Sequence, residues 1–507
     1  MSRTSASVSY FRYSPLLVLA WGLISVLFIP VIPIASGFGW DGVFYGRVAM
    51  DFQHMIGSMD SYHSGRIFPG VLLHYIMVLV GAPLTVSAAL VAYQAYTVCI
   101  LTASAWLWVR IAAHAALSPA ACWTGFMALF MGYPVLNLYF YYPSLSDITA
   151  FFIGMSMLYA YLTKNPVFLL VVSVLAFFCW PTGIVIGLIL FIWSGVDNTF
   201  WVERKKGIRP FLLIALVLSP FLFENLLIAN IDSIVHFAAT RGLGGEKVAD
   251  LLDEGVGKSY NWLALVGSLI VVAYLLFIYY TLLWDFDVVA FIRASFRKRI
   301  LLRAAVALGL LIALSFLKRM LYNPELPTVT LKSYLFDVVH LSTRFPLLFL
   351  TCHICYWGPI VLLLLIFFRD WTGLVKRTDF PLMLGLLFTL LFSINGESRA
   401  ITNFYPLIVF SVVRAIDFYK LKNRRLFLFL FLGVSLLFSK LWLPIHLPAT
   451  VFPERIDTGL EQFPMQWYFM NFGLWINGEM YLLHVLAAIV FFGLIYLYWR
   501  REKSTAR

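Results

Sequence analysis

Long, uninterrupted apolar segments recur along the whole chain and constrain its fold more than any other feature. Residues 261–283, "NWLALVGSLIVVAYLLFIYYTLL", are typical and carry no charged side chain. A helix of roughly 17 to 25 apolar residues is long enough to cross a hydrocarbon core about 30 Å thick. A membrane β-barrel would instead need short strands in which apolar and polar residues alternate. The sequence therefore predicts an all-α polytopic membrane protein.

The composition agrees with this prediction. The chain has 507 residues, of which 62% are hydrophobic and only 12% are charged, and its mean hydropathy is +0.87. Soluble domains carry about 25% charged residues, so a water-facing surface cannot be built from this chain. We expect residues 1–507 to form a single integral membrane domain.

The apolar segments predict about 12–14 transmembrane helices. The first, at 15–35, is longer than the roughly 7 to 15 residues of a signal-peptide core, so we expect an uncleaved span. The other predicted spans are 86–109, 119–133, 148–163, 166–179, 181–197, 210–230, 261–284, 300–317, 346–368, 380–394, 401–418, 426–443 and 480–499. The short pair around "CWPTG" reads as a hairpin, because Pro181 interrupts a helix there.

The basic residues predict the orientation of these spans. The net charge is +12, and Lys and Arg cluster in short loops at 204–209, 293–303, 369–377, 420–425 and 500–507. Such loops are typical of the cytoplasmic side of a membrane. We therefore expect both termini on the cytoplasmic side of the membrane. No basic region outside the bilayer is large enough to hold a nucleic acid, so the excess charge indicates contact with membrane lipids.

The same orientation leaves several longer segments outside. The first outer loop, 37–85, contains "IFPGVLLHYIMVLVGAP", which is too short for a confident span and predicts helices lying at the membrane interface. Further outer loops are expected at 134–147, 231–260, 318–345, 395–400 and 444–479. These loops hold most of the acidic residues that are not beside a basic loop, so chemistry is expected on the outer face.

Three outer stretches place a carboxylate directly beside an apolar span. They are "GWDGVFYGRVAMDF" with Asp41, "YFYYPSLSD" with Asp147 and "NGESRAITNFYP" with Glu397. A charged group at such a position is partly desolvated, which favours a functional role. For Arg47, Asp51 and Asp60 we prefer interfacial anchoring.

Arginines accompany these carboxylates on the predicted outer side. The planar guanidinium fork suits phosphate oxygens, which makes Arg66, Arg344 and Arg399 candidates for binding a phosphate. A carboxylate can act as a general base or bind a divalent cation. We expect four further side chains to line the same cavity: Tyr45, His63, Tyr142 and Asn403. Such a site suits a substrate with an isoprenoid tail, a phosphate and a polar head, entering sideways from the bilayer.

Short motifs in the first outer loop carry a family resemblance. "WDGVFYGRVA" followed by "RIFPGVLLHYI" resembles the first outer loop of the GT-C superfamily of membrane glycosyltransferases. "YYPSLSD" before a span and the later "GESR" resemble features of bacterial members. The resemblance covers the first 180 residues by motif and the remainder by layout.

The resemblance implies transfer of a sugar from a polyprenyl-phosphate donor to an acceptor hydroxyl. The acceptor would be a glycan, a lipid or a protein on the periplasmic face, in cell-envelope glycan or glycolipid synthesis. Asp41 would deprotonate or orient that hydroxyl, with Asp147 and Glu397 as further catalytic carboxylates. Arg66, Arg344 or Arg399 would hold the departing phosphate.

One position departs from the family pattern. Many GT-C members have a second acidic residue next to the first, whereas this chain has Gly42 after Asp41. Asp51, Asp60 or Asp147 would then supply the second acid. A divalent cation is compatible with this site, although no ligand set is evident.

Two other functions fit the layout. A lipid-linked oligosaccharide flippase or transporter would have a similar number of spans, but transporters place ionisable groups near the midplane, on broken helices of paired repeats. The charges here lie at the outer edge of the spans, which favours an enzyme. A polysaccharide polymerase or ligase would use the same chemistry and differ only in acceptor and donor size.

The cysteines do not predict a metal or disulfide site. Cys352, His353 and Cys355 form a CxxC with an interposed histidine, but no second half of a metal site accompanies it. We interpret them as packing residues of a helix.

Overall fold

The computed structural model describes most of the chain. The described residues are 10–196, 262–326, 345–377, 380–418, 424–443 and 478–505 without 33, 40 and 285, together with 200, 338, 342 and 343. The predicted span at 210–230 and the predicted outer loop at 231–260 lie outside them, as do residues 444–477 of the predicted outer loop at 444–479.

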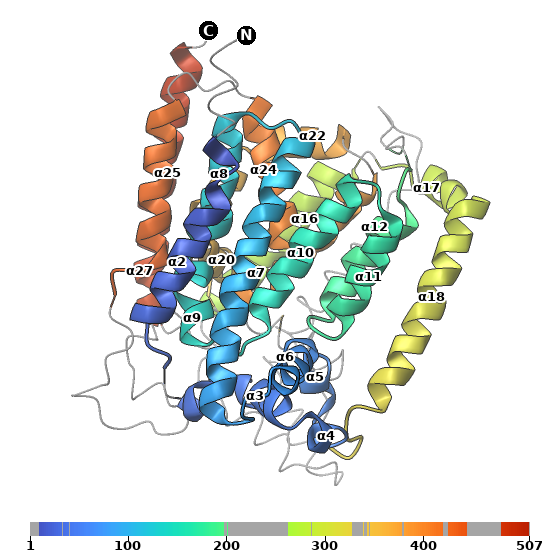
Figure 1. Cartoon of the computed structure of the whole chain (residues 1–507). Helices are drawn as coiled ribbons and strands as arrows, with labels where there is room; N and C mark the ends of the chain where they lie inside the picture. Colours follow the sequence, from blue (N-terminus) through green and yellow to red (C-terminus); the bar gives the residue numbers. More distant parts are fainter. Residues whose placement is uncertain are drawn as a thin grey trace, which may run out of the picture.

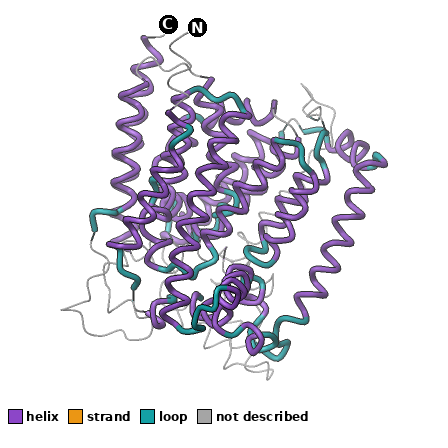
Figure 2. The backbone as a smooth tube through the Cα atoms, viewed as in Figure 1, coloured by secondary structure: helices purple, strands orange, loops and turns teal. Residues whose placement is uncertain are grey.

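The described residues form helices joined by loops and contain no strand (Figure 2). The α-helices are α2 (Ser14–Phe28), α3 (Gly42–Met50), α4 (Phe52–Met55), α5 (Ser61–Ser64), α6 (Phe68–Leu79), α7 (Val86–His114), α8 (Pro119–Phe130), α9 (Tyr139–Tyr141), α10 (Asp147–Leu162), α11 (Pro166–Phe177), α12 (Thr182–Ile192), α16 (Trp262–Ile278), α17 (Val288–Ser295), α18 (Lys298–Arg319), α20 (Leu348–Trp357), α21 (Pro359–Ile366), α22 (Phe368–Arg377), α23 (Phe380–Phe392), α24 (Tyr405–Phe418), α25 (Arg424–Ser439) and α27 (Gly478–Thr505).

The long helices agree with the prediction of an all-α polytopic membrane protein. Four helical segments are long and apolar enough to cross a membrane: Val86–His114, Val266–Leu283, Lys298–Arg319 and Tyr481–Arg501. A fifth arises if the bent pair Pro119–Phe130 and Pro134–Tyr141 forms one span. Most of the other predicted spans within the described residues overlap a shorter apolar helix, and the predicted span at 401–418 overlaps α24.

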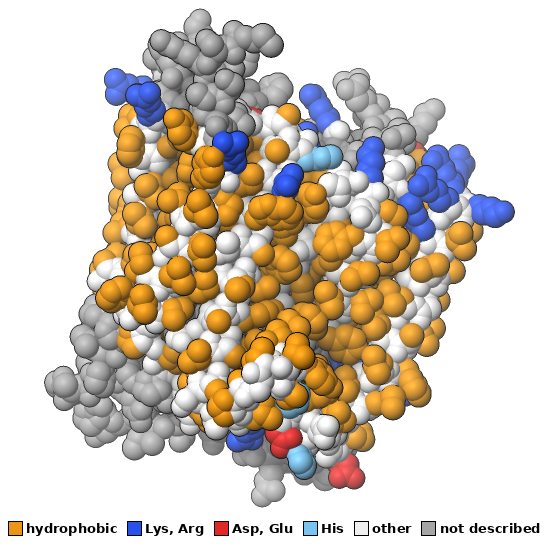
Figure 3. All heavy atoms as spheres, in the orientation of Figure 1, with side chains coloured by type: hydrophobic (Ala, Val, Ile, Leu, Met, Phe, Trp, Pro, Cys, Tyr) orange, Lys and Arg blue, Asp and Glu red, His pale blue; other side chains and the backbone are white. Residues whose placement is uncertain are grey.

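The surface of the bundle is suited to lipid. On α18, for example, the side chains of Leu302, Ile312 and Phe316 are each more than 60% exposed. An apolar belt covers the middle of the visible face in Figure 3. An exposed apolar surface this large does not persist in water, so the fold confirms an integral membrane protein.

Local sequence signals explain where the helices begin. The side chains of Thr85, Ser118 and Asn165 each accept a hydrogen bond from a backbone N–H in the first turn of α7, α8 and α11. Such N-caps satisfy donors that an isolated helix end leaves unpaired. Pro119 and Pro166 occupy first-turn positions, where proline removes no helical hydrogen bond. These signals set the turns that return the chain across the bundle.

One predicted span is interrupted. Residues 346–368 form α20 and α21, which meet at Gly358, where φ is +77°. A left-handed backbone conformation is accessible to glycine at little cost, so the chain bends between the two helices. Cys352, His353 and Cys355 lie buried on α20.

The two ends of the bundle differ in charge. The start of α2 and the end of α27 lie at the same end in Figure 1. On the face drawn in Figure 3, most Lys and Arg side chains gather at that end, and acidic side chains are most prominent at the other. The short helices α3 to α6 lie together at the second end, where α6 is seen nearly end-on, across the long helices (Figure 1). They belong to the predicted first outer loop.

The turn between α11 and α12 lies directly above this group (Figure 1). The backbone N–H of Phe68, at the start of α6, donates to the carbonyl of Phe178 over 2.9 Å. The hairpin expected at "CWPTG" therefore forms, and its turn packs on the first outer loop.

Candidate functional site

Asp41 lies immediately before α3, in a segment held by a second loop. The hydroxyl of Ser144 donates to the carbonyl of Phe38 over 2.7 Å. A side chain at Gly42 would collide with the same hydroxyl. A side chain at position 42 would therefore require the Ser144 hydroxyl to turn away from the carbonyl of Phe38.

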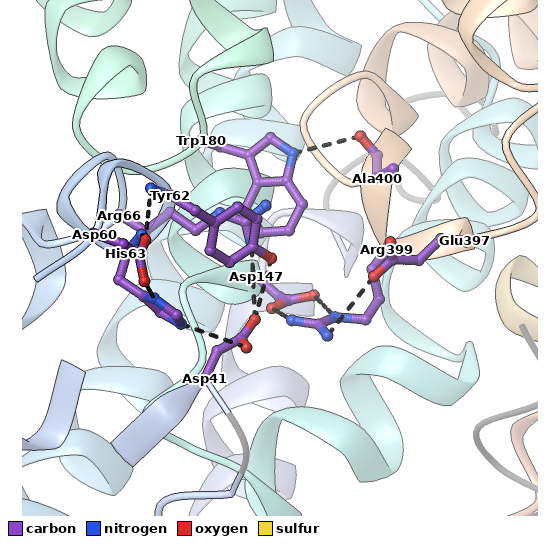
Figure 4. Close-up of polar contacts among 10 residues, drawn as sticks. All are labelled: Asp41, Asp60, Tyr62, His63, Arg66, Asp147, Trp180, Glu397, Arg399 and Ala400. Atoms are coloured by element: carbon purple, nitrogen blue, oxygen red, sulfur yellow. Dashed lines mark hydrogen bonds and ion pairs between the residues drawn. The ribbon is translucent and has the colours of Figure 1, made fainter. Parts of the chain in front are cut away.

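Asp41 faces three polar side chains of α5 and the residues after it (Figure 4). The hydroxyl of Tyr62 donates to Oδ2 over 3.2 Å. His63 Nε2 lies 3.7 Å from Oδ1, and Arg66 Nη1 lies 3.9 Å from Oδ2. The carboxylate is 27% exposed, so a ligand can still reach it.

His63 is held from its other side by Asp60, the N-cap of α5. One oxygen of Asp60 accepts hydrogen bonds from the backbone N–H groups of Tyr62 and His63. The other lies 2.6 Å from His63 Nδ1. Asp60, which the sequence suggested as an interfacial anchor, thus fixes both a helix start and an imidazole ring.

Arg66 is packed between two aromatic rings. Its guanidinium carbon lies 4.1 Å from the ring centre of Tyr62 and 4.2 Å from that of Trp180. Such stacking covers both faces of the guanidinium. Its contact with Asp41 is too long for a hydrogen bond, and within the described residues its side chain donates none. The N–H groups in its plane are therefore available to an anion.

A second ion pair lies beside this group (Figure 4). Arg399 donates from Nε and Nη2 to the two oxygens of Asp147, each over 2.8 Å. The Asp147 side chain is 0% exposed and that of Arg399 is 9% exposed. Glu397 lies at 4.0 Å from Arg399 Nη1 and is 43% exposed, so it lies at the rim.

The loop that carries Arg399 is braced from two directions. His353 on α20 contacts the hydroxyl of Ser398 at 2.9 Å and the carbonyl of Ser393 at 2.6 Å through its two ring nitrogens. Trp180 Nε1 donates to the carbonyl of Ala400 over 3.4 Å. The same indole that stacks on Arg66 therefore links the Asp41 cluster to the Asp147–Arg399 pair.

Charge interactions perturb the groups around Asp41. Burial opposes ionisation of Asp41, but the interaction with His63 and the charges of Arg399 and Arg66 outweigh it and hold its pKa well below the usual range. Burial lowers the pKa of His63, but the carboxylates of Asp41 and Asp60 outweigh it and raise that pKa above the usual value. Asp41 is therefore ionised at neutral pH, and the pKa of His63 is higher than that of an ordinary histidine.

The structure brings together most of the predicted site residues. Asp41, His63 and Arg66 form one cluster, and Asp147, Glu397 and Arg399 lie beside it (Figure 4).

Three predicted cavity residues lie further back. Tyr45 is 1% exposed and lies behind His63, with their ring centres 6.2 Å apart. Tyr142 packs against Gly39 and supports the segment before Asp41. Asn403 is buried, with Gly154 and Gly183 against it. Arg344 lies outside the described residues.

Sequence reasoning missed three contributors to the site. Tyr62 and Trp180 cover the faces of Arg66, and aromatic residues are too frequent in this chain to single them out. Lys318 lies in the last turn of α18, with its ammonium 3.2 Å from the position of a side chain added at Gly65. The sequence feature that could have identified Lys318 is its position at the outer end of a predicted span.

Within the described residues, no three His, Cys, Asp or Glu side chains are grouped closely enough to hold a metal ion. The chain matches no family model, and neither a curated protein nor a solved structure matches it.

Proposed function

We propose that the protein is a GT-C-like glycosyltransferase of a bacterial inner membrane. It moves a sugar from a polyprenyl-phosphate donor to an acceptor hydroxyl on the periplasmic face, in the synthesis of a cell-envelope glycan or glycolipid. The acceptor is a glycan, a lipid or a protein. The motifs around Asp41 suggested this class, and the geometry around the same residue supports it.

One observation carries the proposal. An ionised carboxylate, Asp41, and a guanidinium with free in-plane donors, Arg66, lie 3.9 Å apart at the end of an apolar bundle. Displacement at a sugar carbon brings the attacking hydroxyl and the departing phosphate to the same carbon. A carboxylate suits the hydroxyl, and an arginine stabilises the charge that develops on the phosphate. Both groups can therefore contact the same bound substrate.

The remaining charged residues of the site have supporting roles. The fork of Arg399 is already filled by Asp147, so that pair shapes the wall of the site and adds positive potential beside Asp41. Among the described residues the Arg66 side chain donates no hydrogen bond, whereas Arg399 uses two of its N–H groups on Asp147, so we assign the phosphate to Arg66. Glu397 at the rim is placed to contact the polar head of a substrate.

The charge distribution supports the proposed sidedness. The basic residues gather at the end where α2 begins and α27 ends (Figures 1 and 3). By the positive-inside rule that end is cytoplasmic, which puts the termini inside and the Asp41 cluster outside. The position of the cluster at one end, among short helices, favours an enzyme over a flippase. A polymerase or ligase would use the same site with larger substrates.

Substitution of Asp41 tests the proposal. We expect Asp41→Asn to reduce transfer of labelled sugar from a polyprenyl-phosphate donor by about a hundredfold, because a charged hydrogen-bond partner is lost. The measurement uses purified protein in proteoliposomes, with a panel of donors and a total envelope extract as acceptor. Asp51→Asn is the matched control, since Asp51 lies on the same loop but is 55% exposed. Equal transfer by wild type and Asp41→Asn would refute the role of Asp41.

A further inference from the structure

We propose that His63, and not Asp41, takes the proton from the acceptor hydroxyl, and that Asp60 positions the imidazole for this step. The inference rests on the proposed function and names the residue that performs its proton transfer. The sequence suggested His63 only as a residue lining the cavity, and assigned deprotonation or orientation of the hydroxyl to Asp41.

The contacts of the ring fix which nitrogen is available. Nδ1 lies 2.6 Å from the carboxylate of Asp60, so this nitrogen carries a hydrogen and donates it. In the neutral ring, Nε2 then has a free lone pair, as a general base requires. Phe44 stacks on the ring with centres 3.8 Å apart, which limits its rotation. A base oriented by a carboxylate is a recurring arrangement in catalytic sites.

The available nitrogen, Nε2, lies close to the carboxylate of Asp41, where the acceptor hydroxyl is proposed to bind. Nε2 of His63 is buried, and no described residue hydrogen-bonds to it. It lies 3.7 Å from Asp41 Oδ1, too far for a hydrogen bond. The two atoms are close enough for one hydroxyl oxygen to contact both. A buried polar atom without a partner is costly, so an incoming hydroxyl at this point would be favoured.

Basicity separates the two candidates. The positive groups around Asp41 hold its pKa low, and a weak base accepts a proton poorly. Burial lowers the pKa of His63, but its two carboxylate neighbours outweigh this effect and raise the pKa above the usual value of about 6.5, so the neutral ring is a stronger base than the Asp41 carboxylate. The titratable or charged groups that face His63 or its neighbours are Asp41, Tyr45, Asp60, Tyr62, Arg66 and Lys318. Asp41 then orients the hydroxyl and stabilises the imidazolium that forms.

The proposed step is balanced. The acceptor oxygen forms a bond to the anomeric carbon as its proton passes to Nε2 of His63. The bond from that carbon to the phosphate oxygen breaks, and its electron pair leaves with the polyprenyl phosphate. The imidazolium later releases the proton to water.

The chain contains its own control for this proposal. Asp51 and His54 repeat the arrangement of Asp60 and His63, with a capping aspartate three residues before a histidine and 2.8 Å between Nδ1 and the carboxylate. The His54 side chain is 86% exposed, whereas that of His63 is 13% exposed. A change that acts only through loop structure should affect both pairs, whereas loss of a base should affect one.

The experiment measures sugar transfer against pH in proteoliposomes. We expect His63→Gln to reduce kcat by about a hundredfold or more with little change in KM, and His54→Gln to behave as wild type. Wild-type kcat should rise with pH through the pKa of His63, because only the neutral ring accepts a proton. Asp60→Asn removes a negative charge that raises this pKa, so the rise should move to lower pH.

A chemical rescue guards against a purely structural effect. In His63→Ala, added imidazole should restore part of the transfer, and it should not stimulate Asp41→Asn. Wild-type kcat in His63→Gln, or an acid limb unmoved in Asp60→Asn together with no rescue of His63→Ala, would overturn the role of His63. In either case transfer by the wild type would leave the proposed function standing. No transfer by the wild type from any polyprenyl-phosphate donor would instead refute that function.

Discussion

The charged residues of the site form two groups with different roles. Asp147 and Arg399 satisfy each other through two hydrogen bonds and are almost fully buried. Asp41 and Arg66 are more exposed and only approach each other, at 3.9 Å. Polar groups that are already paired support a structure, whereas incompletely paired ones can bind a ligand. We therefore expect substitutions in the two groups to have different signatures.

Substitution of either member of the buried pair should first of all lower the stability of the fold. Asp147→Asn leaves the charge of Arg399 without its partner, which costs about 3–5 kcal/mol in comparable buried pairs. The double variant Asp147→Asn with Arg399→Gln removes both charges, so its loss should be smaller than the sum of the two single losses. The midpoint of thermal unfolding in detergent measures this. Additive losses would show that the two side chains do not depend on each other.

At this scale the sequence predicted the residue types better than their partners. The pairing of Asp147 with Arg399 joins residues 252 positions apart, which no local pattern reveals. The sequence identified both because each lies at the edge of an apolar span. It undervalued Asp60, since its role depends on the ring of His63, which is visible only once α5 has formed.

Among the helices, the close approach of α3 and α6 positions the cluster. A side chain added at Gly70 on α6 would come within 2.8 Å of the carbonyl oxygen of Tyr45 on α3. That same carbonyl accepts a hydrogen bond from Tyr93 on α7 over 2.8 Å, so it is not free to move. The glycine thereby lets α6 lie against α3, and α3 begins beside Asp41.

Gly70→Ala should therefore separate α6 from α3. We expect a loss of about 1–3 kcal/mol from overpacking, and reduced sugar transfer because Asp41 and His63 move apart. The control is Gly309→Ala on α18, where a new side chain meets nothing within 4 Å and helix propensity favours alanine. Thermal midpoints and transfer rates measure both effects. A neutral Gly70→Ala would contradict this packing.

The sequence predicted where along the chain each helix lies better than it predicted where the helix ends lie in the bundle. The predicted spans coincide with helices because apolar length and capping residues are local signals. The turn at "CWPTG" was expected, but the stacking of Trp180 on Arg66 was not. That contact depends on where the α11–α12 hairpin ends relative to α5, which is set by packing among several elements. The break at Gly358 was likewise missed, because glycine inside an apolar run is common.

Across the whole molecule, charged residues are distributed asymmetrically between the two ends of the bundle. The bundle presents an apolar belt between a basic end and an end that carries α3 to α6 (Figures 1 and 3). The fold class could be predicted from composition and apolar length, since few folds bury a backbone in lipid. The sidedness rests on the basic loops, and the proposed periplasmic site depends on it.

Labelling of engineered cysteines measures on which side of the membrane the Asp41 cluster lies. On a background with the exposed Cys99 replaced by alanine, Ser58→Cys lies in the loop between α4 and α5, and Lys298→Cys lies at the basic end of α18. We expect a membrane-impermeant maleimide to label Ser58→Cys in cells whose inner membrane is intact and whose outer membrane is permeable. Lys298→Cys should be labelled only after lysis. Labelling of Lys298→Cys in intact cells, with Ser58→Cys protected, would place the Asp41 cluster in the cytoplasm and contradict the account.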